Sequence, residues 1–174
     1  MNATPKFGKV LLIAMMCTVA VACSKKVKEE PAPPPPSTTA PAPDTGPVTP
    51  GAYTPESLDT DACLRQRVVY FDFDQDALRP EFQAAMACHA KYLRDRPSSR
   101  MSLEGNADER GSREYNLGLG ERRGNAVSSA LQANGGSGSQ ITVVSYGEER
   151  PTCNESGEDC WAKNRRVEIV YTAK

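Results

Sequence analysis

One segment, residues 104–133, constrains the fold more than any other, because an arginine stands in it where a leucine is expected. The pattern predicts the end of a strand, a turn and then a long helix, with Ser112 as N-cap and Asn134-Gly135-Gly136 as its stop. Successive helical residues are rotated by about 100°, which identifies the side chains that share the core-facing stripe. They are Asn116, Leu119, Arg123, Val127, Ala130 and Leu131.

A guanidinium on a core-facing stripe needs a partner, because burying it alone costs several kcal/mol. Arg123 is that residue, whereas Arg122 points toward the flank of the helix. The candidate partner is Asp108, in the turn before the helix. Either Asp108 neutralises Arg123 in an internal salt bridge, or both side chains line a pocket and hold a ligand. The residues alone leave both arrangements open.

Alternating strand and helix patterns predict one α+β domain over residues 62–174. The expected order is β-α-β-α-β-β, and the strand–helix–strand crossover places the helices on one face of the sheet, as a two-layer sandwich. The last two strands are candidates to pair through the loop between them. The expected strands are 67–73, 101–104, 140–146 and 166–171, and the expected helices are 79–96 and 112–133.

The N-terminus has the features of an export signal. Residues 1–22 comprise a basic start, an apolar stretch too short to span a bilayer, and small residues directly before Cys23. This resembles the lipobox of bacterial lipoproteins, with Ala20 where leucine is usual, and implies cleavage and acylation at Cys23. Ser24, in place of an aspartate, implies the outer membrane. The alternative is an ordinary secretory signal with an incidental cysteine.

Residues 23–61 are expected to form the lipidated N-terminus and a proline-rich tether. The run Pro31-Ala32-Pro33-Pro34-Pro35-Pro36 and the spaced prolines after it disfavour helix and sheet. Such a segment lacks the apolar residues to bury a core.

Without Cys17 in the signal segment and the candidate lipidation site Cys23, four cysteines remain: Cys63, Cys88, Cys153 and Cys160. An even number in an exported chain predicts disulfides, in one of three pairings. We favour Cys153–Cys160, which closes the loop before the last strand and leaves Cys63–Cys88. A zinc site is disfavoured, because the spacing matches no common finger and the one histidine, His89, falls on an apolar helix face. There a hydrogen-bonded core residue is expected.

The charge balance argues against a nucleic-acid partner. The chain carries a formal charge of −1, and loss of Lys6 and Lys9 with the signal lowers it by two to −3. Nucleic-acid binding needs a concentrated basic face. The arginines at 110, 113, 122 and 123 alternate with carboxylates, a pattern typical of a helix surface laced with salt bridges.

Six segments together resemble the OmpA-like peptidoglycan-binding domain family, and within it the peptidoglycan-associated lipoproteins (Pal). They cover nearly the whole expected domain, and the lipobox and tether fit the same family. Two positions at the helix, Gly120 and Gly124, depart from its usual serine and alanine, and Asn106 replaces a common histidine. The matching segments are 70–74, 104–111, 115–116, 119–123, 144–147 and 164–168.

The resemblance implies binding of peptidoglycan stem peptides through meso-diaminopimelate. The family's key aspartate maps onto Asp108, its key arginine onto Arg123, its helix asparagine onto Asn116, and the basic residue before the last strand onto Arg165. Diaminopimelate ends in one ammonium and one carboxylate, so Asp108 is expected to accept the ammonium and Arg123 to bind the carboxylate through two hydrogen bonds.

The implied protein is a lipid-anchored, periplasm-facing outer-membrane protein that tethers the membrane to the cell wall. Its expected partners are peptidoglycan, the outer membrane, TolB and other Tol-system proteins, and no cofactor, metal or catalytic residue is expected. One alternative is a periplasmic protein-interaction scaffold with minor wall contact. Another is a wall hydrolase using the carboxylates of Glu104, Asp108 and Glu109, but no activated nucleophile or metal cluster accompanies them.

Overall fold

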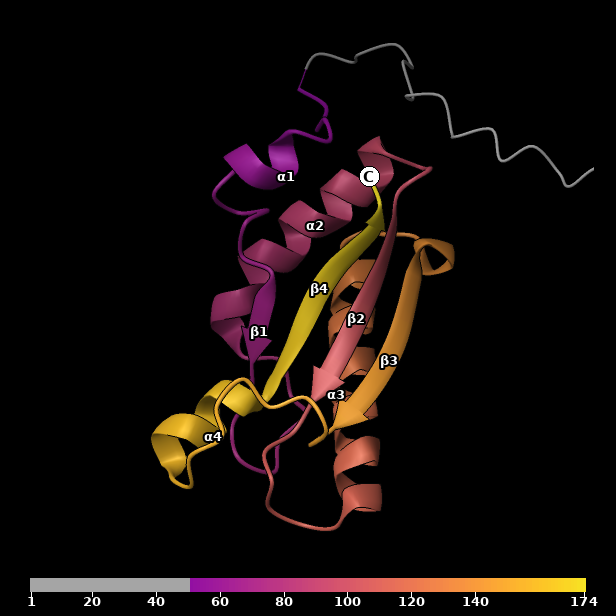
Figure 1. Ribbon diagram of the computed structural model, residues 1–174. Helices are drawn as coiled ribbons and strands as arrows, with labels where there is room; N and C mark the ends of the chain where they lie inside the picture. The colour runs from indigo at the N-terminus through magenta and orange to yellow at the C-terminus, as the bar shows by residue number, and fades with distance from the viewer. Residues whose placement is uncertain (1–50) are drawn as a thin grey trace, which may run out of the picture. The chain divides into compact units, whose positions relative to one another are not determined.

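The computed structural model describes residues 51–174 (Figure 1). The expectations for the signal peptide, for acylation of Cys23 and for most of the tether lie outside the described residues. Over residues 51–174, no helix has both the length and the apolar character that a bilayer crossing requires.

A four-stranded sheet forms the centre of the fold, in the order β1-β4-β2-β3 (Figure 1). The parallel pair is β2 with β3, and β4 is antiparallel to both β1 and β2. The strands are β1 Val68–Tyr70, β2 Arg100–Asn106, β3 Ile141–Gly147 and β4 Arg166–Ala173.

The expected pairing of the last two strands is wrong, because β4 lies between β1 and β2, and β3 lies on the far side of β2. The crossover through α3 fixes β3 parallel to β2, and the chain then crosses the end of the sheet to the other side of β2. There β4 buries Val167 and Ile169 in the central core, with exposed fractions of 0% and 2%. The central position of β4 therefore buries more apolar surface than an edge position beside the half-buried β3 would.

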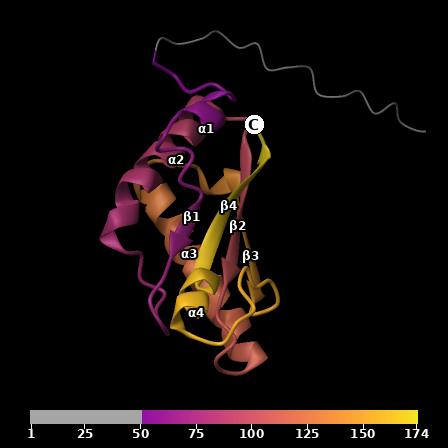
Figure 2. The ribbon, with the colours of Figure 1, turned by 60° about the vertical axis from the view of Figure 1, so that its left-hand side comes forward.

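Two helices cover one face of the sheet, as expected for the α+β sandwich (Figure 2). The 3₁₀ turn η1 (Pro80–Phe82) leads into α2 (Gln83–Asp95), and α3 spans Arg113–Ala133. Pro80 at the first position is tolerated because its missing N–H would have no partner there. Three short helical segments were not expected: α1 (Ser57–Thr60), η2 (Gly138–Gln140) and α4 (Glu158–Asn164).

The packed part of the chain begins before the expected boundary at residue 62. Leu58 in α1 and Leu64 are fully buried against Tyr92 of α2, and Tyr53 packs against this cluster. The sequence does not reveal this earlier start, because only a few apolar residues mark it next to a proline-rich stretch.

Glycines let the backbone of α3 touch the sheet. A Cβ added at Gly105 of β2 would lie 1.9 Å from the carbonyl oxygen of Gly120, and one at Gly124 would lie 2.5 Å from Cγ1 of Val143. Both distances are shorter than any real contact. Gly120 and Gly124 therefore serve helix–sheet packing, and they hold α3 at a fixed depth on β2 and β3.

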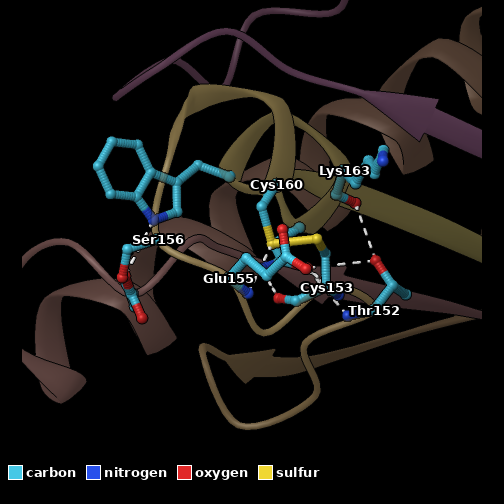
Figure 3. The surroundings of a disulfide bond; sticks show 9 residues. Thr152, Cys153, Glu155, Ser156, Cys160 and Lys163 are labelled. Carbon is cyan, nitrogen blue, oxygen red and sulfur yellow. Dashed lines mark hydrogen bonds between the residues drawn. A yellow bond between two sulfur atoms is a disulfide. The ribbon is translucent and has the colours of Figure 1, made fainter.

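Both favoured disulfides are present. Cys63 and Cys88 join the leading segment to α2. Cys153 and Cys160 close the loop before β4 onto α4 (Figure 3). Asn164 strengthens the second closure, because its side chain accepts hydrogen bonds from the backbone of Thr152 and Cys153 at 2.9 and 3.1 Å.

His89 is a core residue, as expected. Its exposed fraction is 0%; Nε2 donates to the carbonyl of Gln66 at 3.1 Å, and Nδ1 accepts from the hydroxyl of Tyr171 at 2.8 Å. Burial lowers the pKa of His89 to about 4, so the ring is neutral at pH 7.

Candidate functional site

A pocket of about 390 Å³ lies beside the first turns of α3. Three of the four expected peptidoglycan-binding residues line it: Asp108, Asn116 and Arg123. The fourth, Arg165, lies behind Asp108 and lines a separate hollow. The full lining is Phe73, Asp74, Asp108, Arg110, Gly111, Tyr115, Asn116, Leu119 and Arg123.

The loop between β2 and α3 is shaped by its own sequence. The Asp108 carboxylate accepts a hydrogen bond from the backbone N–H of Arg110, two residues on, which closes an Asx turn. Gly111 follows with φ +112°, a conformation that favours glycine. Ser112 caps α3 by accepting from the backbone N–H of Tyr115 at 3.2 Å, as its N-cap assignment predicted. The carboxylate is thereby held at the pocket wall.

Asp108 is 4% exposed, and all the hydrogen bonds it accepts come from two arginines. Arg110 donates from Nε to Oδ1 at 3.1 Å and from Nη2 to Oδ2 at 2.7 Å. Arg165 donates from Nη1 to Oδ2 at 3.1 Å. Burial alone would raise the pKa of Asp108, but the bonds from Arg110 and Arg165 outweigh it and hold this pKa below its ordinary value.

Arg165 supports Asp108 from behind and does not reach the pocket. Its side chain is 6% exposed and also donates to the carbonyl of Phe71 at 3.1 Å and to Glu158 Oε1 at 2.5 Å. With bonds to three separate segments, this guanidinium is fixed in place.

Arg123 is fully buried and donates to three backbone carbonyls. Nε donates to Gln75 at 2.8 Å, Nη1 to Asn106 at 2.9 Å and Nη2 to Asp72 at 3.1 Å. Burial and the nearby charge of Arg165 lower the pKa of Arg123 to about 10, so it remains charged at pH 7.

The internal salt bridge that the sequence left open is not formed, because Asp108 pairs with Arg110 and Arg165, and Arg123 pairs with no carboxylate among residues 51–174. A guanidinium has five N–H groups, and the three carbonyl bonds leave two without a hydrogen bond among residues 51–174, on a residue that lines the pocket. Arg123 is thus a buried cation with unused donors at a pocket wall.

The rim of the pocket joins three segments. Asn116 is 1% exposed, and its amide donates to the carboxylate of Glu148. The hydroxyl of Tyr115 donates to Asp74. Asp74 has φ +57°, a conformation typical of turns, and it also lines the pocket. This turn ends β1 at Tyr70, three residues before the expected end of the strand.

Sequence reasoning missed Arg110. Its guanidinium lies 3.9 Å from the ring centroid of Phe73 and 4.1 Å from that of Trp161. The salt-laced surface pattern holds for Arg113 and Arg122, whose exposed side chains pair with Glu149 and Asp76. It fails for Arg110 and Arg123. The signal that distinguishes Arg110 is its position two residues after Asp108, within reach of the same carboxylate.

Trp161 is half-buried on α4, next to Cys160, and its indole N–H donates to Glu109 at 3.0 Å. Helix α4 places Trp161 and Glu158 against the pocket residue Arg110, and Arg165 follows the helix directly. These three residues therefore lie behind the pocket lining, and a disulfide closes the preceding loop onto α4 (Figure 3).

A model of the OmpA family matches residues 70–165, which contain every pocket residue. The chain belongs to the OmpA family. A relative from Pseudomonas putida named peptidoglycan-associated lipoprotein is 42% identical over 94% of this chain and 96% of its own length. A Haemophilus influenzae relative of the same name is 35% identical, over 95% and 99% of the two chains.

Two solved structures share the fold of this chain. The peptidoglycan-associated lipoprotein from Burkholderia pseudomallei is 41% identical with a TM-score of 0.65, over 67% of this chain and 98% of that chain. The C-terminal domain of Helicobacter pylori MotB is 21% identical with a TM-score of 0.56, over 61% of this chain and 83% of that chain, and it shares the fold alone.

Proposed function

We propose that this protein binds the peptide stems of peptidoglycan non-covalently, through the zwitterionic end of meso-diaminopimelate, and tethers the outer membrane to the cell wall. One observation carries the proposal. The pocket places the buried guanidinium of Arg123, which has unused N–H donors and no carboxylate partner among residues 51–174, together with the carboxylate of Asp108. The names of the relatives as peptidoglycan-associated lipoproteins support the same ligand.

The chemistry of the ligand complements these groups. The ligand carboxylate accepts from Arg123, the ammonium donates to Asp108, and Asn116 supplies an amide. Each charge-assisted hydrogen bond contributes about 1.5–3 kcal/mol, so the affinity for one stem is modest. A membrane-anchored protein facing a dense polymer gains from high local ligand concentration, which makes weak binding effective.

Co-sedimentation with purified sacculi tests the binding site. We expect Arg123→Lys to lower the bound fraction at least tenfold, because lysine does not supply the paired donors that a carboxylate needs. Asp108→Asn should lower it similarly. The matched controls are the neighbours Arg122→Lys and Glu109→Gln, which should sediment like the unaltered protein. Equal sedimentation of all four variants would reject the site. Incubation with sacculi should release no soluble wall fragments.

The lipid anchor has its own test. In cells, Cys23→Ala should release the protein from the membrane fraction and leave sacculus binding unchanged, because Cys23 lies far along the chain from the pocket residues. Retention of Cys23→Ala in washed membranes would contradict acylation at this cysteine.

The proposal includes a partnership with TolB in the Tol system, which rests on the family resemblance. Co-purification of TolB with the full chain tests it. The Arg123→Lys variant also distinguishes a protein that tethers the membrane to the wall from a protein-interaction scaffold. If TolB capture and envelope integrity both survive the loss of sacculus binding, the protein is an interaction scaffold and its wall contact is minor.

A further inference from the structure

We propose that Arg110 occupies the place of the ligand's ammonium group and must leave Asp108 before the ligand binds. The inference rests on the proposed function, and it adds a residue that sets affinity and selectivity in the same pocket. It starts from the hydrogen-bonding capacity of one carboxylate.

Asp108 has no free acceptor site. A carboxylate offers about four lone-pair positions. Oδ1 accepts from the backbone N–H and Nε of Arg110, both at 3.1 Å, and Oδ2 accepts from Arg110 Nη2 at 2.7 Å and Arg165 Nη1 at 3.1 Å. An incoming ammonium therefore has to replace one of these donors.

Of the two arginines, only Arg110 is placed to leave. Arg165 is 6% exposed and is fixed by Phe71 and Glu158 as well as by Asp108. The side chain of Arg110 is 29% exposed and lines the pocket, whereas Arg165 does not. Apart from Asp108, Arg110 is held by the exposed carboxylate of Glu158 and by the faces of Phe73 and Trp161.

A second carboxylate already pairs with the guanidinium of Arg110. Arg110 Nη2 lies 3.5 Å from Glu158 Oε2, and the side chain of Glu158 is 61% exposed. Arg110 can therefore leave Asp108 and keep its charge paired with Glu158. The exchange selects for ligands with a cationic group, because a neutral or anionic group cannot take the place of a guanidinium on Asp108.

Binding then competes with an internal contact, which lowers the apparent affinity. Arg110→Met keeps an apolar side chain of similar length between Phe73 and Trp161 and removes the competing charge. The control is Arg113→Met, which removes the same charge from an exposed residue that pairs with Glu149 outside the pocket.

The test uses the full chain in detergent and the tripeptide L-Ala-γ-D-Glu-meso-diaminopimelate, with titration calorimetry. We expect Arg110→Met to bind about tenfold more tightly than the unaltered protein, since a charge-assisted contact no longer has to be broken, and Arg113→Met to be unchanged. The gain should vanish with a tripeptide acetylated at the free amine of its diaminopimelate residue, and it should persist with one acetylated at the amine of L-Ala. Unchanged or weaker binding by Arg110→Met would overturn the proposal.

A second readout needs no variant. Trp161 is the one tryptophan of the chain, and Arg110 lies against its ring. We expect the tripeptide to shift tryptophan emission in the unaltered protein, with the midpoint found by calorimetry, and a constant emission at saturation would also overturn the proposal. If the unaltered protein binds the tripeptide and sacculi without these effects, the displacement is wrong and the proposed function stands. If the unaltered protein binds neither the tripeptide nor sacculi, both the displacement and the proposed function are wrong.

Discussion

Two buried polar side chains, His89 on α2 and Arg123 on α3, occupy equivalent core-facing positions on their helices but differ in how the fold satisfies their hydrogen bonds. Each lies on the face that packs against the sheet, and each is fully buried. His89 is neutral, and both of its ring nitrogens have a partner within the fold. Arg123 is charged, and its three carbonyl bonds leave two donors toward a pocket.

The difference shows how to separate a structural polar residue from a binding one. Burial and an unusual pKa are common to both residues. What differs is whether the fold fills the hydrogen-bonding capacity of the group. A group that is filled internally stabilises the core, whereas one that is incompletely filled beside a pocket is available to a ligand.

The largest effect is expected from Gly105→Ala. This variant should displace α3, which carries Arg123, and leave α2 with His89 in place. The added Cβ would lie 1.9 Å from the carbonyl oxygen of Gly120, so backbone must move on both sides. Side-chain overlaps cost about 1–3 kcal/mol, and we expect this one to lower the free energy of unfolding by about 4 kcal/mol or more. Sacculus binding should be lost as Arg123 leaves the Asn106 carbonyl. Urea unfolding and co-sedimentation measure both, and near-native values would contradict the contact.

Removing each disulfide by paired alanine substitutions should separate stability from binding. Cys63–Cys88 spans 25 residues beside the Gln66–His89 bond, and Cys153–Cys160 spans 7 residues and closes the loop that leads into α4. Chain entropy gives about 3.5 kcal/mol of stability for the first and about 2.5 kcal/mol for the second.

We therefore expect the first removal to cost more stability and to leave tripeptide affinity unchanged, and the second to cost less and to weaken binding. The reason is that α4 carries Arg165, the support of Asp108. Thermal unfolding and calorimetry on the two double variants measure these effects. Equal effects on binding would show that α4 needs no brace.

Acid should weaken the fold through His89 before it affects the pocket. The folded chain holds His89 neutral down to about pH 4, whereas the unfolded chain takes up a proton near pH 6.5. Since the unfolded state binds more protons in this range, the free energy of unfolding should fall by about 3 kcal/mol as the pH drops from 6.5 to 4. His89→Gln does not titrate and should flatten this part of the profile. Denaturation at stepped pH gives the comparison.

Binding should not follow that profile. The pKa of Arg123 is about 10 and that of Asp108 is below its ordinary value, so neither changes charge between pH 5 and 8. Tripeptide affinity should be constant over this range. A change in affinity that parallels the His89-dependent change in the free energy of unfolding would mean that the surroundings of His89 and the pocket are coupled.

The sequence predicted the local structure around Arg123 but missed the contacts between residues that lie far apart in the chain. Cap and stop residues predicted α3 as 112–133 against an observed Arg113–Ala133, and helical periodicity predicted that Arg123 faces inward. Local patterns do not encode which strands become neighbours, so the central position of β4 was missed. For the same reason Asp108 was matched with Arg123, whereas its main partners are Arg110 and a residue 57 positions away.

Two other features were missed because their signals are short or ambiguous. The seven residues of α4 carry too little periodicity to separate a helix from a loop, yet they include Glu158 and Trp161, which contact the pocket residue Arg110. Gly120 and Gly124 were recognised as unusual in a helix, but only the depth of α3 on the sheet explains them. The ligand itself stays a prediction.

The smallest effect is expected from Gly118→Ala, the counterpart of the packed glycines on the same helix. A Cβ at Gly118 meets only the end of Arg122, at 3.4 Å, so nothing has to move. Alanine is favoured over glycine in a helix interior by about 0.8–1 kcal/mol, and the free energy of unfolding should rise by about that amount with sacculus binding unchanged. Urea titration of Gly118→Ala beside Gly105→Ala checks the opposite signs. A loss of stability at both would mean that α3 tolerates no added volume on either face, and the contrast between its sheet-facing glycines and Gly118 would lose its physical basis.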